Sequence, residues 1–506
     1  MKSVKILSLV LALVMLVACF AACGGPSDVT KPPVDTKPQV NTPADGGSLT
    51  DTANRDAVKD NVPEGLDFSS QSDNTVTFFT RDNQDTFKYE MDAEKTVNDT
   101  LIDAVFYRND AVEDRLGVVI EQVQQNGAWE VIDSWNQTMR NAVLTKSGDY
   151  DAAAIYASAG SALAVEGLYY NVLDVPYIEL SKPWWNKSII NETELFNTVY
   201  FLAGDIAISE VAWGVTLFYN KNLMNELYAT EEIDLYQIVR DDKWTVDEMY
   251  KLTSNAWIDT NSDGVLNSGD TFGFRYADSS GDGAMDAWIA AMGIDITTMV
   301  DGYPELTFYN EHTVEAYEKL KTLHLGNPGT LVETNHNSVA DFIAGNQLFT
   351  RGFIHSGQEL RAMNDDYGIL PLPKFDEEQE EYRTLSSNLS SLVVVLSTVT
   401  DLEMVGSTLE LMAAESYKQA TPAFFDIVLK GKYSDAPQDA EMYDLILNSF
   451  TYNFGFCFST KSIEGIGSLF RVLSDDLSQR YESNKIKYQT ALDALVDKLD
   501  EISFMS

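Results

Sequence analysis

Residues 213–276 contain the pattern that most constrains the fold of this chain. An apolar, β-rich run from Val215 to Tyr219 leads directly into a helix that begins after Asn220. A second helix begins at Thr245, which has capping-box spacing with Glu248. An acidic loop and the strand-like run FGFRY follow. The succession of a strand, two helices, a loop and another strand predicts a mixed α/β fold.

The same alternation of strands and helices continues on both sides of this stretch. Residues 76–80 and 150–156 are β-rich, and between them apolar residues from Leu101 to Leu116 recur at helical spacing until Gly117 ends the helix. Residues 392–396 again read as a buried strand. A chain of 506 residues is too long for a single core, so we expect two lobes.

The first residues indicate secretion. A basic start at Lys2 and Lys5 precedes an apolar run that is too short for a transmembrane helix, as in a signal peptide. Small residues precede cysteine twice, and both sites resemble the lipobox of bacterial lipoproteins. Leu16 favours Cys19 as the acylated residue, whereas the glycines that follow favour Cys23. We therefore expect residues 1–23 to be a lipoprotein signal peptide, with Cys23 or Cys19 as the lipid anchor.

Composition defines the next segment and excludes one class of partner. Residues 24–65 are rich in Pro, Asp, Thr and Gly, which predicts a disordered tether. The formal charge of −43 argues against nucleic acid as a partner, because the phosphates would be repelled. Beyond the signal boundary only Cys457 is certain to remain, so no disulfide framework is expected.

Several motifs occur together in an order that resembles one family. They are the WGVTLFYNKNLMNELY, WTVDEMY and DTNSDGVLNSGDTFGF runs, preceded by FYRNDAVE and followed by VADFIAGNQLF and YGILPLP. This order is similar to that of the extracellular solute-binding lipoproteins of ABC importers, in the carbohydrate-binding group related to maltose-binding protein. The resemblance extends from Thr75 to about Leu499. No internal repeat is visible.

The resemblance implies a type II periplasmic-binding-protein-like fold, an α/β fold with two hinge-linked lobes and a ligand cleft between them. One lobe would comprise residues 66–196 plus 389–451, and the other residues 197–388 plus 452–506. The chain would cross between the lobes near Asn197, Asn388 and Tyr452.

The resemblance also implies a function. The protein would be a monomeric lipoprotein on the extracellular face of the cell membrane. It would capture an extracellular solute, which the family resemblance implies is an oligosaccharide, and deliver it to the permease subunits of an ABC transporter. It would need no cofactor. The alternatives are a surface glycan-binding or sensor-input protein without transport, and a secreted glycoside hydrolase.

The residues themselves give poor support to an enzyme. The chain has no HExxH, GxSxG, Walker or Rossmann glycine motif, and its four histidines are scattered. Among 78 carboxylates, a pair at the spacing of a glycosidase would occur by chance. We therefore expect no catalytic residues.

A sugar site combines aromatic rings, which stack on the apolar faces of the sugar, with hydrogen-bonding side chains. Candidates were sought at the ends of predicted strands, where the family places its cleft loops. The candidate ligand residues are Arg81, Asp82, Tyr156, Ser158, Trp213, Asp278, Trp288, Phe353 and His355. Trp213 and Tyr156 stand above the others, and each candidate could instead belong to the core.

The acidic loop has the oxygen spacing of a calcium loop. Its predicted metal ligands are Asp259, Asn261, Asp263, the carbonyl of Val265, Asn267 and Asp270. Two features depart from an EF-hand: the last ligand is an aspartate with a short side chain, and no second helix follows. A structural Ca²⁺ is expected, and the alternative is an Asx-rich turn that binds nothing.

Overall fold

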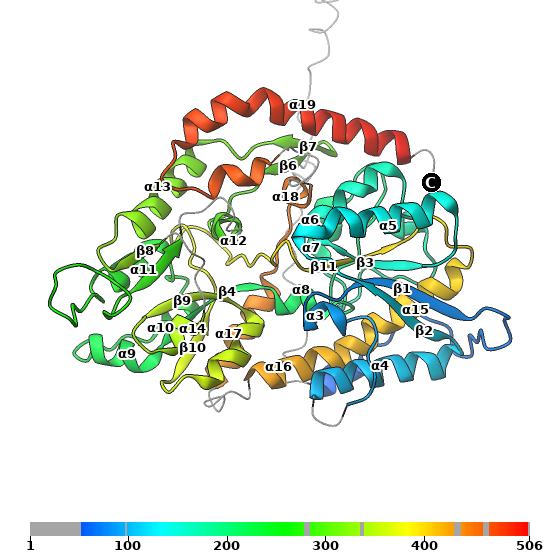
Figure 1. Cartoon of the computed structure of the whole chain (residues 1–506), viewed down its shortest axis with the longest axis horizontal. Coiled ribbons are helices and arrows are strands. Elements are labelled where there is room, and N and C mark those ends of the chain that lie inside the picture. The colour runs from blue at the N-terminus through cyan, green and yellow to red at the C-terminus, as the bar shows by residue number, and fades with distance from the viewer. Residues whose placement is uncertain are drawn as a thin grey trace, which may run out of the picture. The chain divides into compact units, whose positions relative to one another are not determined.

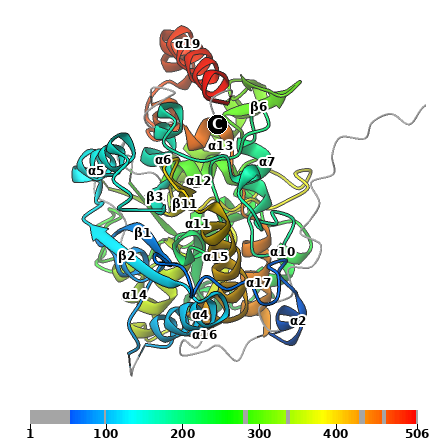
Figure 2. The same cartoon turned by 90° about the vertical axis from the view of Figure 1, so that its right-hand side faces the viewer.

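A computed structural model of the protein gives the arrangement in Figures 1 and 2. It describes residues 52–96, 99–277, 284–333, 339–429, 437–458 and 465–503. The chain divides into two units, residues 1–44 and 45–506, and every described residue belongs to the second. The predicted signal peptide (1–23) and both candidate anchors, Cys19 and Cys23, therefore lie outside the described residues.

The described strands and helices alternate along the chain, as expected. The strands are β1 (Thr75–Arg81), β2 (Val119–Gln125), β3 (Ala152–Tyr156), β4 (Val215–Asn220), β5 (Phe274–Ala277), β6 (Thr297–Val300), β7 (Tyr303–Leu306), β8 (Thr330–Glu333), β9 (Phe349–Phe353), β10 (Tyr367–Leu370) and β11 (Ser391–Val395).

The helices are α2 (Thr52–Ala57), α3 (Asp85–Lys88), α4 (Thr100–Leu116), α5 (Ile132–Thr145), α6 (Ala157–Gly160), α7 (Lys187–Thr193), α8 (Ile208–Ala212), α9 (Lys221–Leu227), α10 (Leu235–Arg240), α11 (Val246–Ser254), α12 (Ala284–Ala291), α13 (Glu311–Leu325), α14 (Val339–Ile343), α15 (Leu402–Glu415), α16 (Thr421–Leu429), α17 (Pro437–Asn448), α18 (Phe454–Cys457) and α19 (Leu477–Ser503).

The first sheet has the strand order β11-β3-β1-β2. Strand β1 runs parallel to β2 and β3, and β11 is antiparallel to β3. Successive side chains of β1 face opposite sides, so Phe79 stacks on Trp135 of α5 at 4.3 Å while Phe78 belongs to the core that includes residues of α4 and α15. Helices therefore cover both faces, which explains why β3 and β11 are buried along their whole lengths.

The second sheet has β4 in the middle, antiparallel to both β10 and β9. All six residues of β4 are buried, in agreement with its apolar sequence. A hydrogen bond from the amide of Leu348 to the carbonyl of Phe272 (2.9 Å) links the start of β9 to the residues before β5, which pairs in parallel with β8. Strand β4 and its neighbours thus form the centre of a second sheet, whose buried residues share one core cluster with Phe79 and Trp135.

Helix boundaries follow the capping residues seen in the sequence. Asn220 accepts a hydrogen bond from the amide of Leu223, and Thr245 accepts one from the amide of Glu248. Gly117 ends α4 with φ of 66°, a left-handed conformation that favours glycine.

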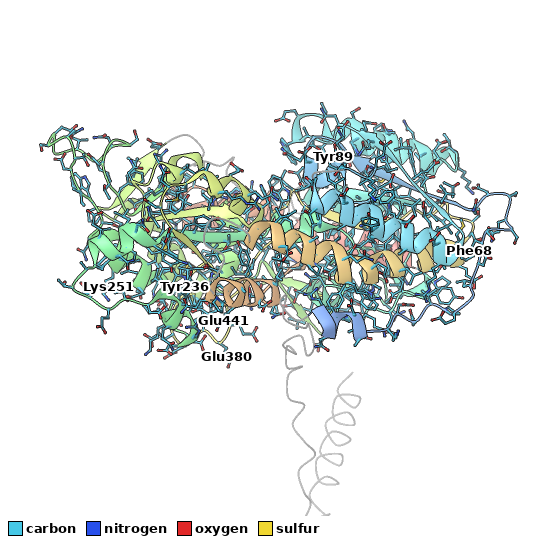
Figure 3. The ribbon with its side chains drawn as sticks, turned by 90° about the horizontal axis from the view of Figure 1, so that it is seen from below. Phe68, Tyr89, Tyr236, Lys251, Glu380 and Glu441 are labelled. Atoms are coloured by element: carbon cyan, nitrogen blue, oxygen red, sulfur yellow. The ribbon has the colours of Figure 1, made fainter. Side chains whose placement is uncertain are left out.

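Helix α17 packs beside β10 and the helices next to it. Its Asp439 accepts a hydrogen bond from Tyr236 and lies 3.2 Å from the amino group of Lys221, and its Glu441 pairs with Arg240 at 2.6 Å. Figure 3 shows Tyr236 and Glu441 near each other on α10 and α17. Our division of the chain placed residues 389–451 in the first lobe, whereas this helix contacts elements of the second sheet.

Part of the expected tether is folded. Residues 52–65 include α2, in which the guanidinium of Arg55 lies 4.3 Å from the ring centroid of Tyr417 and donates to its carbonyl (3.0 Å). Arg115 pairs with Asp60 at 2.8 Å. These contacts of Arg55 and Asp60 fix residues 52–65 to the folded part, although the composition of this segment predicts disorder.

Candidate ligand-binding site

Three chain segments lie side by side where the two sheets are connected. Residues 384–387 pair with the segment before β4 on one side and with residues 449–451 on the other. The amide of Ser387 donates to the carbonyl of Trp213 (2.9 Å), and that of Thr384 donates to the carbonyl of Ser449 (2.8 Å). A Cβ on Gly214 would lie 2.6 Å from the tip of the Phe450 ring, so a larger residue there would require that ring to move. We call these three segments, which are residues 213–214, 384–387 and 449–451, the ribbon. The expected crossings near Asn388 and Tyr452 lie next to it.

Arg81 lies at the end of β1 and faces this junction. Its guanidinium lies 3.9 Å from the ring centroid of Phe87 and 5.2 Å from that of Tyr156. It donates to the carbonyl of Leu389 and to the hydroxyl of Ser391, both at 2.8 Å. Burial lowers the pKa of Arg81 to about 10, so the side chain remains cationic at neutral pH. Arg81 thus ties β1 to the segment that enters β11.

Trp213 lies inside an aromatic cluster. Its ring stacks on Phe87 at 5.6 Å, and Phe353 and His355 each lie 4.8 Å away. Its indole nitrogen donates to the hydroxyl of Thr86 (2.9 Å), and only 9% of the residue is exposed. The cluster joins α3, which follows the first sheet's β1, to residues that flank β4 and β9 of the second sheet.

His355 in this cluster is neutral at neutral pH. Its Nδ1 lies 2.9 Å from the carbonyl of Ala212, and its ring stacks on Phe353 with an interplanar angle of 11°. Burial lowers its pKa below the usual value. His355 therefore adds no charge to the cluster, whose cations are the guanidinium groups of Arg81 over Phe87 and Arg351 over Phe353.

Tyr156 and Trp129 form a second aromatic pair near the end of β3. Their ring centroids lie 5.8 Å apart, and Trp129 is 49% exposed whereas Tyr156 is 4% exposed. Burial raises the pKa of Tyr156 to about 12, and the charges of Arg81 and Arg471 lower it. The tyrosine hydroxyl is thus protonated at neutral pH, beside an indole ring that faces solvent.

Several buried polar atoms near these strand ends have no hydrogen-bond partner among the described residues. They include the hydroxyl of Ser158, which is 3% exposed, and the side-chain oxygen of Asn83. Buried polar atoms are normally satisfied, so each is suited to accept or donate a hydrogen bond to water or a ligand. Asp82, next to Asn83, is exposed.

The structure brings most predicted ligand residues to the junction, but not all. Arg81, Tyr156, Trp213, Phe353 and His355 share contacts there. Trp288 is 1% exposed and packs in the core, against Phe274 of β5 and His324 of α13. Asp278 lies outside the described residues.

Sequence reasoning missed Trp129. The apolar run Val118–Ile120 predicts a strand that ends at Ile120, whereas β2 extends to Gln125. A correct strand end would have placed Trp129 in the set. The polar glutamines at the end of β2 hid this extension, because they lie on an edge strand with exposed positions.

The acidic loop forms a network of internal hydrogen bonds. Asp259 accepts from the amides of Asp263 and Gly264, and Asp270 accepts from those of Thr260 and Asn267. In this arrangement the predicted ligand oxygens already receive backbone or amide donors. Across the described parts of the chain, no three or more His, Cys, Asp and Glu side chains are grouped to hold a metal ion. Calcium binding by Asp259, Asn261, Asp263, Val265, Asn267 and Asp270 stays a prediction.

No protein-family model matches the chain, and no curated protein matches it. Solved structures do. A cyclo/maltodextrin-binding protein complexed with maltotetraose aligns with TM-score 0.52 and 11% identity, over 85% of this chain and 97% of the other. The galacto-N-biose-/lacto-N-biose I-binding protein of the ABC transporter from Bifidobacterium longum aligns with TM-score 0.51 and 13% identity, over 82% and 97%. M. tuberculosis UspC gives 0.50 and 14%, over 83% and 100%.

This chain has the type II periplasmic-binding-protein fold. Identities of 11–14% establish the fold and not the ligand. The expected resemblance to carbohydrate-binding ABC substrate-binding proteins is confirmed at that level. Among the helices that the structure describes, none combines the length and apolar character needed to span a membrane.

Proposed function

We propose that this protein binds an extracellular oligosaccharide and delivers it to the permease subunits of an ABC transporter, without catalysing a reaction. It would act as a monomer anchored by lipid at Cys23 or Cys19 on the outer face of the cell membrane. The observation that carries the proposal is Trp129, 49% exposed, beside Tyr156, and Ser158 two residues later has a buried hydroxyl with no hydrogen-bond partner among the described residues. An indole face covered by a sugar ring, with hydroxyl groups nearby, is the chemistry of a sugar site.

Within this site the predicted residues take different roles. We propose Trp129 and Tyr156 as the aromatic surface, with Ser158 and Asp82 as hydrogen-bonding groups. Arg81 holds the segment before β11 in place, as its contacts with Leu389 and Ser391 indicate. Trp213, Phe353 and His355 support the site from the opposite side of the junction.

A thermal-shift screen with neutral oligosaccharides tests the proposed ligand class. A bound ligand stabilises the folded protein by RT ln(1 + [L]/Kd), about 2.7 kcal/mol at a hundredfold excess over Kd. We expect at least one oligosaccharide to raise Tm in a concentration-dependent way, without release of reducing sugar. If no member of a broad panel shifts Tm, the sugar assignment is wrong; if reducing ends accumulate, the protein is a hydrolase.

Uptake tests the transport role separately from binding. Cells that express the chain with its permease should accumulate a radiolabelled sugar identified by the screen, and cells that lack only this chain should not. Equal uptake in both would leave a surface glycan-binding or sensor function in place of transport.

A further inference from the structure

The third segment of the ribbon joins two parts of the molecule through consecutive residues. The amide of Tyr452 donates to the hydroxyl of Ser188 on α7 (2.8 Å). The next residue, Asn453, donates through its side chain to the carbonyl of Thr297 on β6 (2.7 Å) and accepts from the amide of Thr297 (3.2 Å). A single peptide link therefore separates a residue fixed to α7 from a residue fixed to β6.

The chain after α7 makes a tight and strained turn. Leu195 and Thr198 exchange backbone hydrogen bonds of 3.2 and 3.0 Å, and the two residues between them, Phe196 and Asn197, have φ of 55° and 56°. Two-residue hairpin turns of this type favour Asn-Gly or Asp-Gly, because both residues need positive φ. A phenylalanine in this conformation is a true outlier. Such strain persists where the surroundings require it.

The β6–β7 hairpin ends in a turn of the same type with a suitable sequence. Its turn residues Asp301 and Gly302 have φ of 51° and 84°. Tyr303 follows directly and is 54% exposed. Its ring meets that of the strained Phe196 edge to face, with ring centroids 5.7 Å apart. Figures 1 and 2 show the hairpin between α19 and α7.

A polar contact accompanies the ring contact. Arg383, which lies next to the second segment of the ribbon, donates to both carboxylate oxygens of Asp295 at 3.1 Å. The pKa of Glu192 on α7 is raised to about 7, because burial and the charge of Asp295 raise it more than the charge of Arg383 lowers it. The turn after α7 therefore contacts the β6–β7 hairpin through Phe196 and Tyr303, and the charges of Asp295 and Arg383 act on Glu192 of α7.

We propose that the Phe196–Tyr303 contact is a latch that sets the hinge angle at Tyr452–Asn453. Because α7 and β6 are fixed to neighbouring residues of the same peptide link, any rotation there must change the separation of Phe196 and Tyr303. The edge-to-face geometry of the two rings favours one separation. The inference rests on the proposed function for its purpose, control of access to the binding site, but its test needs no ligand.

The test compares scattering and hydrogen exchange of four full-length proteins: the natural chain, Tyr303→Phe, Tyr303→Ser and Phe196→Asn. Tyr303→Phe keeps the ring edge, whereas Tyr303→Ser removes it. Phe196→Asn removes the other ring with a residue that tolerates positive φ, so the turn is retained. We expect the natural chain and Tyr303→Phe to give one scattering curve. Tyr303→Ser and Phe196→Asn should share a shifted curve, with faster amide exchange at residues 449–453.

Urea unfolding accompanies the comparison, and unchanged midpoints would show that all variants are folded. The latch is overturned if the four scattering curves coincide while the hinge amides exchange equally. It is also overturned if Tyr303→Phe behaves like Tyr303→Ser, because the ring contact would then not be the cause. A missing sugar ligand in the thermal-shift screen would contradict the proposed function without affecting either result.

Discussion

At the scale of single residues, Trp213 shows how surroundings decide between a ligand contact and a core position. It was our leading candidate for a sugar-stacking wall, yet Phe87 already covers one face of its ring. Trp213→Ala should lower the free energy of unfolding by about 3–5 kcal/mol, because a large side chain leaves a cavity. Trp213→Phe should cost about 1 kcal/mol for the lost hydrogen bond to Thr86. Urea melts measure both, and a change within about 0.5 kcal/mol for the alanine variant would mean that the ring is not packed.

The buried side chain of Glu210 makes the stability of the protein depend on pH. It is 2% exposed, and burial raises its pKa to about 7, although the hydrogen bond from Asn186 lowers it. The folded protein therefore holds a proton that the unfolded chain has lost between pH 4.5 and 7. The contribution of this residue to stability falls as pH rises through that window.

The variant Glu210→Gln isolates this effect, because its side-chain oxygen still accepts from Asn186. The free energy of unfolding of the variant, relative to the natural protein, should rise from pH 5 to pH 8. Denaturant melts at both pH values measure the difference. A difference that does not change with pH would show that Glu210 is not buried as a neutral acid.

At the scale of elements, the sequence predicted those strands and helices whose ends are set by nearby residues. Strand β4 and its helix could be predicted because an apolar run ends at Asn220, whose side chain caps the helix. The turn at Phe196 could not, because its residues contradict the preference of the turn, and the partner that stabilises it, Tyr303, is distant in the sequence. Helix α2 was missed because Tyr417, which holds its Arg55, is also distant in the sequence.

Calcium binding by the acidic loop can be tested through thermal stability. If Asp259 to Asp270 binds Ca²⁺, a chelator should lower the Tm of the natural protein, because an ion bound only by the folded state stabilises it. Asp263→Ala removes a predicted ligand and should abolish that sensitivity. Calorimetric scans with and without chelator measure it. Equal sensitivity of both proteins would place the ion elsewhere, and no sensitivity in either would leave the loop as an Asx-rich turn.

At the scale of the whole molecule, the order of motifs predicted the fold, while the site required the structure. The two sheets and their connecting ribbon follow from alternating elements that each bury an apolar face. The site depends on which strand ends meet in the folded protein. In the structure Trp288 lies in the core, and Trp129 lies beside Tyr156. The burial of Trp288 is not visible in the local sequence, because it follows a strand-like run as a cleft residue would, and Trp129 was hidden by the polar end of β2.

The central claim is that the surface at Trp129 and Tyr156 binds sugar. Isothermal titration of the natural protein, Trp129→Ala and Tyr107→Ala with an oligosaccharide that raises Tm tests it most directly. Tyr107 is the matched control, since its ring is 43% exposed on α4 and is not part of the site. Stacking on an indole contributes about 1–3 kcal/mol, so Trp129→Ala should weaken binding roughly 10- to 100-fold while Tyr107→Ala binds as the natural protein does. Equal affinity of all three proteins would contradict the account.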